Sequence, residues 1–225
     1  GNVLVTAKYE GDYIVNNHPN RGSSEVCIAL ARSFADIGDI VRGKDMFKSN
    51  DNVENGLREV FKKIYEGFLD KGAREHYKEV KNGNYIKLRE DWWTANRDQV
   101  WKAMTCVAPE NAYFRKTEAD GIGISSLILP YSKCGRDTDP PVVDYIPQRL
   151  RWMSEWSEYF CNVLNKEIDE MNNQCKDCEM SRRCNNDTEG EKCKKCKEQC
   201  QIFKELVSKW KNEFDKQSMK YMELY

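Results

Sequence analysis

Six of the ten cysteines crowd into one segment near the end of the chain, and their spacing permits two kinds of chemistry. They are Cys175, Cys178, Cys184, Cys193, Cys196 and Cys200. Two Cys-x-x-Cys units separated by a loop are typical of a thiolate site for zinc. A high and even number of cysteines is equally typical of disulfides in an oxidising compartment. The segment therefore holds either a zinc site or a set of disulfides.

The helical phase of these cysteines favours disulfides. At about 100° per residue, Cys175 and Cys178 continue the apolar stripe of the helix expected before them. Cys193, Cys196 and Cys200 fall on or beside the apolar stripe of the helix expected after them. A turn rich in Asn, Asp and Gly separates the two helices, so we expect a long antiparallel hairpin. A zinc site in an intracellular scaffold or enzyme is the alternative.

A hairpin centred near Asp187 predicts how the cysteines pair. The expected pairs are Cys175–Cys200, Cys178–Cys196 and Cys184–Cys193. The same register sets Ile168 against Val207, so it aligns the apolar seam together with the cysteines. Because a disulfide needs Cα atoms about 4.4 to 6.8 Å apart, we expect the two helices to converge at their cysteine end.

Four further cysteines lie outside this segment. They are Cys27, Cys106, Cys134 and Cys161. Their number suffices for two more disulfides, which we expect to form, but the sequence does not assign their pairing.

Basic side chains gather around the expected hairpin turn. They are Arg182, Arg183, Lys192, Lys194, Lys195 and Lys197. A solvated surface is the first interpretation of this cluster. Contact with an acidic glycan is the sharper alternative, because clustered positive charge attracts sulfated polymers.

Groups suited to catalysis are scarce. The only histidines are His18, in a turn, and His76, in a charged stretch, and both are expected at the surface. The glycine pair at 121–123 lacks the helix and the third glycine of a dinucleotide site. Carboxylate pairs such as Asp36 and Asp39 are helical neighbours, which we interpret as salt-bridged or solvated. We expect no enzyme, no cofactor and no metal.

Composition restricts the class of partner. The chain has 36 basic and 37 acidic side chains, whereas domains that bind nucleic acids are usually basic. We therefore expect no nucleic-acid partner. No stretch approaches the roughly 20 apolar residues that span a bilayer, and residues 1–10 do not resemble a signal peptide. We expect a fragment or internal domain whose membrane anchor lies outside this chain.

Apolar periodicity predicts an all-α fold with irregular loops. The expected helices run from Ser24 to Gly43, from Asn52 to about Phe68, from about Glu90 to Cys106, from Pro147 through the first cysteines, and from about Cys193 to Leu224. Gly43 stands where a left-handed helix cap belongs. Residues 1–22 are mixed, and residues 107–145 read as loop, with 122–129 as the single candidate strand.

The long helix after Pro147 carries two apolar stripes. The first contains Leu150, Met153, Phe160, Leu164, Ile168 and Met171. The second contains Trp152, Trp156, Tyr159 and Val163. A helix that is apolar on two sides is normally buried on two sides. We therefore expect the first half of this helix to lie centrally, between two packed units.

Three sequence blocks resemble the signature blocks of Duffy-binding-like domains. They are ARSFADIGDIVRG at 31–43, DWWTANRDQVWKAMTC at 91–106 and DYIPQRLRWMSEWSEYFC at 144–161. Such domains build the variant erythrocyte membrane protein family of Plasmodium falciparum. The likeness extends over essentially the whole chain, and segments 144–156 and 195–200 are most similar to the beta subclass.

This resemblance implies a division into subdomains. Residues 1–22 correspond to the end of a first subdomain, and residues 23–145 to the helical bundle of a second. Residues 146–225 correspond to the cysteine-rich helical hairpin of a third. The hairpin expected from helical phase agrees with this assignment.

The resemblance also implies a function and a location. Family members are displayed on the surface of the infected erythrocyte, adhere to a host cell-surface receptor, and vary antigenically under exposure to antibodies. Some beta-subclass members bind intercellular adhesion molecule, through a segment largely beyond the last hairpin helix. Because other members bind sulfated glycans, a glycan-binding module is the alternative function.

Overall fold

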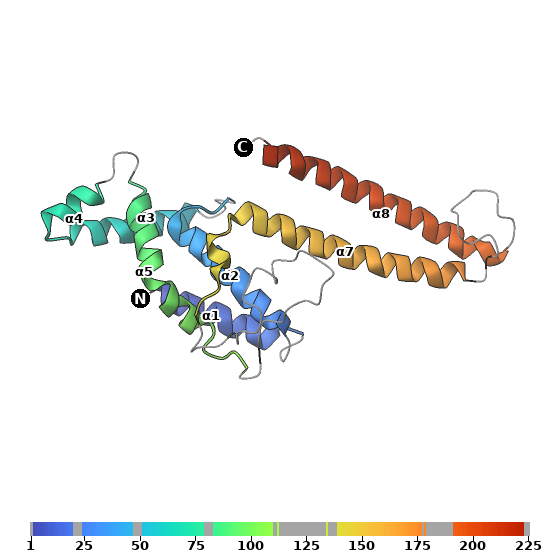
Figure 1. Ribbon diagram of the computed structural model, residues 1–225, viewed down its shortest axis with the longest axis horizontal. Helices are drawn as coiled ribbons and strands as arrows, with labels where there is room; N and C mark the ends of the chain where they lie inside the picture. Colours follow the sequence, from blue (N-terminus) through green and yellow to red (C-terminus); the bar gives the residue numbers. More distant parts are fainter. Residues whose placement is uncertain are drawn as a thin grey trace. The chain divides into compact units, whose positions relative to one another are not determined.

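All regular secondary structure in the described part of the chain is helical (Figure 1). The computed structural model describes residues 2–19, 24–46, 51–78, 83–109, 112, 134, 139–176, 178 and 191–222. The helices are α1 (Asn2–Asn17), α2 (Ser24–Arg42), α3 (Asp51–Glu66), α4 (Lys71–His76), α5 (Ile86–Met104), the 3-10 helix η1 (Val142–Tyr145), α7 (Gln148–Cys175) and α8 (Glu191–Met222). The expected all-α fold is confirmed, whereas the candidate strand at 122–129 lies outside the described residues.

The chain divides into two compact units, Gly1–Arg151 and Trp152–Tyr225. The subdomain boundaries expected near residues 22 and 145 stay a prediction. Gly43 has a φ of 72°, as its expected role as a left-handed cap of α2 requires. Among the described residues, no helix is both long and apolar enough to cross a membrane.

The core of the first unit lies between α2 and α5. Phe34 of α2 packs against Trp93 and Trp101 of α5, with ring centroids 5.2 and 5.3 Å apart. All three side chains are fully buried. Burial of such large aromatic surfaces dominates the stability of a helical core.

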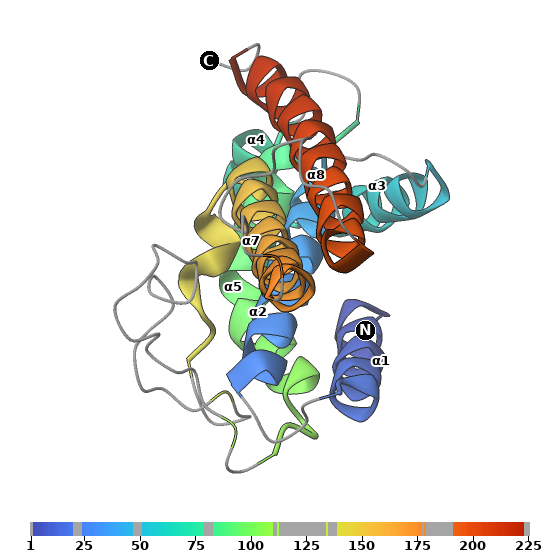
Figure 2. The same cartoon turned by 90° about the vertical axis from the view of Figure 1, so that its right-hand side faces the viewer.

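Three helices escaped the sequence analysis, namely α1, α4 and the short 3-10 helix η1, which lies in the segment read as loop. Helix α1 lies alongside α2 and α5 (Figure 2). Its Gly11 is packed so closely that a Cβ atom there would overlap the Met104 carbonyl group at the end of α5. The apolar residues of α1 are interrupted by polar and glycine positions, so periodicity alone did not reveal this helix.

Arg89 is a fully buried arginine that joins three segments of the first unit. Its guanidinium donates to the carbonyl groups of Val41 and Ile40, at the end of α2, at 2.6 and 2.9 Å. It also binds both carboxylate oxygens of Glu54 in α3, at 2.8 and 2.9 Å. Hydrogen bonding from Arg89, more than any other cause, holds the pKa of Glu54 below its usual value of 4.5.

Asp144 of η1 is a second buried centre of hydrogen bonds. Its carboxylate accepts from Trp93 Nε1 at 2.8 Å and from two nitrogens of Arg97 at 2.7 and 3.0 Å. Its backbone carbonyl accepts from Arg42 at 2.6 Å. These contacts hold η1 against both α2 and α5.

Arg151 fixes the first turn of α7 on α2. Its guanidinium donates to Asp36 at 2.6 Å, to Asp39 at 2.7 Å and to the Ile146 carbonyl at 2.8 Å. Burial raises the pKa of Asp39 above its usual 3.8, while the hydrogen bond from Arg151 acts in the opposite direction. The salt-bridged interpretation of Asp36 and Asp39 is therefore confirmed.

The second unit is the expected antiparallel hairpin of α7 and α8. Disulfides join Cys175 to Cys196 and Cys178 to Cys193, with Cα separations of 4.5 and 5.1 Å. Cys200 is also disulfide-bonded, to a partner outside the described residues. The two helices lie closest at this end and separate toward Met222, as expected (Figure 1).

The expected pairing of these cysteines is wrong by one helical turn. Cys175 is bonded to Cys196 instead of Cys200, and Cys178 to Cys193 instead of Cys196, so the expected pair Cys184–Cys193 does not form either. Helical phase places the cysteines of α8 on one face but does not give the level at which α7 meets them. That level depends on the geometry of the turn, which the sequence does not fix.

The remaining cysteines divide into a bridge and two thiols. Cys27 is bonded to Cys134, which ties α2 to a position more than a hundred residues later. Cys106 and Cys161 are free and exposed, so the expected second bridge is absent for these two residues.

Replacing Glu54 with Gln should destabilise the first unit at neutral pH. Because the folded pKa of Glu54 is lowered, its ion pair with Arg89 stabilises the fold above about pH 4.5 and is lost as the pH falls through the folded value. We expect a loss of about 1 to 2 kcal/mol at pH 7 that shrinks at pH 3, measured by urea unfolding. Glu59→Gln, at an exposed position of the same helix, is the control. Equal losses at both pH values would contradict the role of the ionised carboxylate.

A non-reducing tryptic map should test the described bridges. Trypsin cuts between all six clustered cysteines, and Cys193 and Cys196 are both released as the dipeptide Cys-Lys, so the map distinguishes bonds to these two residues from bonds to Cys200. We expect a peptide that joins Cys27 to Cys134, the peptides of Cys175 and Cys178 each joined to a Cys-Lys dipeptide, and a separate peptide that identifies the partner of Cys200. A fresh, thiol-free sample with Cys175 bonded mainly to Cys200 would refute the observed register.

Candidate functional site on the helical hairpin

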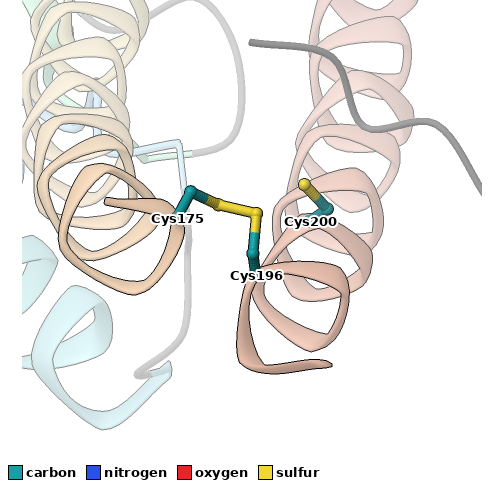
Figure 3. Close-up of side chains that lie close together, drawn as sticks. All are labelled: Cys175, Cys196 and Cys200. Carbon is teal, nitrogen blue, oxygen red and sulfur yellow. A yellow bond between two sulfur atoms is a disulfide. The ribbon is translucent and has the colours of Figure 1, made fainter. Parts of the chain in front are cut away.

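Three sulfur atoms meet at the closed end of the hairpin. The Sγ atoms of Cys175, Cys196 and Cys200 all lie within 4.8 Å of one another, and all three residues are buried (Figure 3). Met171 and Cys193 pack against this sulfur cluster. The three residues are those that the sequence analysis assigned to the disulfide segment.

In this structure the three residues of the sulfur cluster are engaged in disulfides, which stabilise the hairpin. The thiolate, not a disulfide sulfur, is the metal ligand, and every residue of the cluster is disulfide-bonded. The zinc alternative is therefore not supported. Each disulfide restricts the conformations of the unfolded chain and thereby stabilises the folded protein, by about 2 to 4 kcal/mol in the chain-entropy account.

Next to the sulfur cluster, α8 presents part of the expected basic site. Lys194, Lys195 and Lys197 are exposed in its first turns, followed by the exposed Glu198. Arg182, Arg183 and the side chain of Lys192 lie outside what the structure describes. The three lysines stand near a helix N-terminus, whose partial positive charge also favours anions.

A cluster of aromatic rings covers the middle of the hairpin. It consists of Trp156, Tyr159, Phe160, Trp210 and Phe214, and we call it the aromatic cluster. Trp156 and Trp210 are half-buried, with ring centroids 5.1 Å apart. Tyr159 lies beside Trp210 at 5.7 Å but is 63% exposed, and Phe214 lies beside Trp156 at 6.3 Å but is 52% exposed.

The second apolar stripe of α7 is only partly buried within its own unit, and the central position expected for the first half of this helix stays a prediction. Trp152 and Tyr159, both from the second apolar stripe, are exposed. An apolar stripe shows that a helix face can be buried, but only a packed neighbour buries it. The exposed rings are therefore functional candidates that periodicity assigned to the core.

The two histidines both lie in the first unit. His76 is exposed on α4, as expected, with Nδ1 3.3 Å from the Lys87 amine and its ring against that of Tyr77. His18 is half-buried after α1.

The sequence matches the family model of the Duffy binding domain over residues 1–151. It is 24% identical over 224 residues to the Duffy receptor of Plasmodium vivax, covering 98% of this chain but 17% of that protein. The chain thus spans about a sixth of the length of this curated relative.

Solved structures resemble the chain over nearly its whole length. One is the NTS-DBL1(alpha-1) domain of Plasmodium falciparum membrane protein 1 (PfEMP1), with 43% identity and a TM-score of 0.76, covering 98% of this chain and 54% of that one. Another is a DBLb domain of PfEMP1 bound to human ICAM-1, with 34% identity and a TM-score of 0.73, covering 99% and 43%. The family match, the all-α fold and the disulfide-bonded hairpin agree, and the chain belongs to the Duffy binding domain family.

Proposed function

We propose that this chain is an extracellular adhesion module that binds a host cell-surface protein at the surface of the infected erythrocyte. The observation that carries the proposal is its likeness to a DBLb domain that was solved bound to human ICAM-1. That likeness covers 99% of this chain at 34% identity. The beta-subclass character of segments 144–156 and 195–200 supports the same assignment.

Binding without catalysis fits the chemistry of the described residues. The buried charges pair with one another, as Arg151 does with Asp39 and Arg97 with Asp144. The hairpin is cross-linked by disulfides and therefore suits a rigid extracellular scaffold. Exposed aromatic side chains are the residue types that dominate protein–protein contacts.

We further propose that the aromatic cluster contributes to receptor contact. Tyr159 and Phe214 expose most of their side chains while their rings touch the half-buried Trp210 and Trp156. An exposed ring held by a packed neighbour loses little conformational freedom on binding. ICAM-1 is the receptor that we propose, because a similar domain was solved bound to it.

Tyr159→Ala combined with Phe214→Ala should weaken receptor binding. We expect an increase in Kd of about tenfold or more for the ICAM-1 ectodomain, measured by surface plasmon resonance, because truncation of an aromatic contact costs roughly 1 to 2 kcal/mol. Tyr9→Ala combined with Tyr13→Ala is the control, because both rings are exposed on α1 in the first unit. No binding by the unsubstituted chain would exclude ICAM-1, whereas unchanged binding by the double variant would exclude the aromatic cluster.

A sulfated glycan is the second candidate partner. The observation in its favour is the exposed group Lys194, Lys195 and Lys197, within four residues near the start of α8. Helix α8 as a whole is rich in lysine.

Charge reversal at these three lysines tests whether the chain binds a sulfated glycan. Lys194→Glu, Lys195→Glu and Lys197→Glu together should abolish binding to heparan sulfate, and high salt should weaken that binding in the unsubstituted chain. Reversal of Lys204, Lys209 and Lys220, further along α8, makes the same change in net charge and is the control. An equal loss in both triple variants would indicate nonspecific attraction and contradict a defined glycan site.

A further inference from the structure

We propose that the hairpin disulfides can isomerise: when a small thiol opens the Cys200 bridge, Cys175 exchanges its bond to Cys196 for a bond to Cys200. The exchange changes the point of attachment between α7 and α8 by one helical turn. It makes the sulfur cluster a thiol-responsive element of the hairpin, independent of which partner the domain binds.

The geometry places the sulfur of Cys200 beside the existing disulfide between Cys175 and Cys196. The Cys200 sulfur lies within 4.8 Å of both sulfur atoms of the Cys175–Cys196 bridge (Figure 3). Cys196 and Cys200 are four residues apart on α8, so both point from the same face of the helix toward Cys175. A rotation of side chains and a small movement of the backbone bring Cys200 to bonding distance.

Neither the Cys27–Cys134 nor the Cys178–Cys193 bridge has such a neighbour in the part of the chain that the structure describes. Among the described residues, the group of Cys175, Cys196 and Cys200 is the one place where three possible ligand atoms approach so closely. No described third sulfur stands at this distance from the Cys27–Cys134 bridge. Exchange should therefore be confined to the hairpin.

The reaction consumes no oxidant and no reductant overall. A small thiolate of the glutathione class first attacks the partner sulfur of Cys200, which forms a mixed disulfide and releases Cys200 as a thiolate. The Cys200 thiolate then attacks the Cys175 sulfur, so the Cys175–Cys200 bond forms and Cys196 leaves as a thiolate. The Cys196 thiolate finally attacks the mixed disulfide, binds the former partner of Cys200 and releases the small thiol.

The isomer attaches α7 to α8 at a different level. Four residues correspond to about 6 Å along a helix axis. The hydrogen bond from Gln199 to Glu167, at 2.7 Å, joins the two helices about one turn of α8 and two turns of α7 from the bridge, in the present alignment of the helices. A change of attachment would alter the contacts of this end of the hairpin.

The test is a disulfide map of the full chain after exposure to reduced glutathione. Cys106 and Cys161 are first replaced with Ser, because these exposed thiols could act as attackers themselves. The sample is incubated with substoichiometric glutathione at mildly alkaline pH, quenched with an alkylating agent and digested with trypsin below neutral pH. We expect the peptide joining Cys175 to Cys200 to rise roughly tenfold over a thiol-free sample, with Cys27–Cys134 unchanged.

A second variant keeps the test decisive if exchange in the intact cluster is slow. Cys196→Ser leaves Cys175 without its present partner, and we expect Cys175–Cys200 to become its main bond after oxidative refolding. A free or glutathione-capped Cys175 in this variant would overturn the proposal. So would the absence of Cys175–Cys200 peptide from the glutathione-treated chain when the Cys200 bridge has demonstrably opened.

Discussion

The first unit depends on buried guanidinium groups that each bind at least one group on another segment. Arg42, Arg89 and Arg151 are almost completely buried, and a buried charge is tolerable only when it is paired and hydrogen-bonded. Arg89 closes the end of α2 and holds α3, while Arg151 holds the first turn of α7 on α2. Removing a buried carboxylate such as that of Asp39 would leave a guanidinium buried without one of its charge partners, at a cost of about 3 to 5 kcal/mol. Segments distant in the sequence are therefore fixed by electrostatics as well as by the Phe34–Trp93–Trp101 core.

The second unit uses a different source of stability. Two helices alone bury little apolar surface, and several apolar side chains of α7 and α8 stay exposed. Disulfides at one end and the aromatic cluster in the middle hold the pair together. The surface that remains is rigid, partly aromatic and basic near the start of α8. Those properties suit a binding surface, and they match the adhesive function proposed from the family.

Most helices could be predicted because their apolar residues repeat at helical spacing. Helices α2, α3, α5, α7 and α8 agree with the periodicity, within a turn at their ends. Helix α1 escaped prediction because its packing depends on Gly11 and on the end of α5, which periodicity does not register. The exposed Tyr159 was assigned to the core, because a stripe of apolar residues looks the same whether or not a neighbour covers it.

The sequence by itself determined most of the helices, the family resemblance, the antiparallel hairpin and its use of disulfides. The resemblance rests on three sequence blocks, whereas the helices and the hairpin follow from the angular position of each side chain about its helix, which about 100° per residue fixes. Only the tertiary structure decided that Cys175 meets Cys196, that Cys106 and Cys161 stay free, and that Arg151 reaches Asp39. Each of these depends on the axial level at which two helices meet. Turn geometry and packing set that level, and helical phase does not predict it.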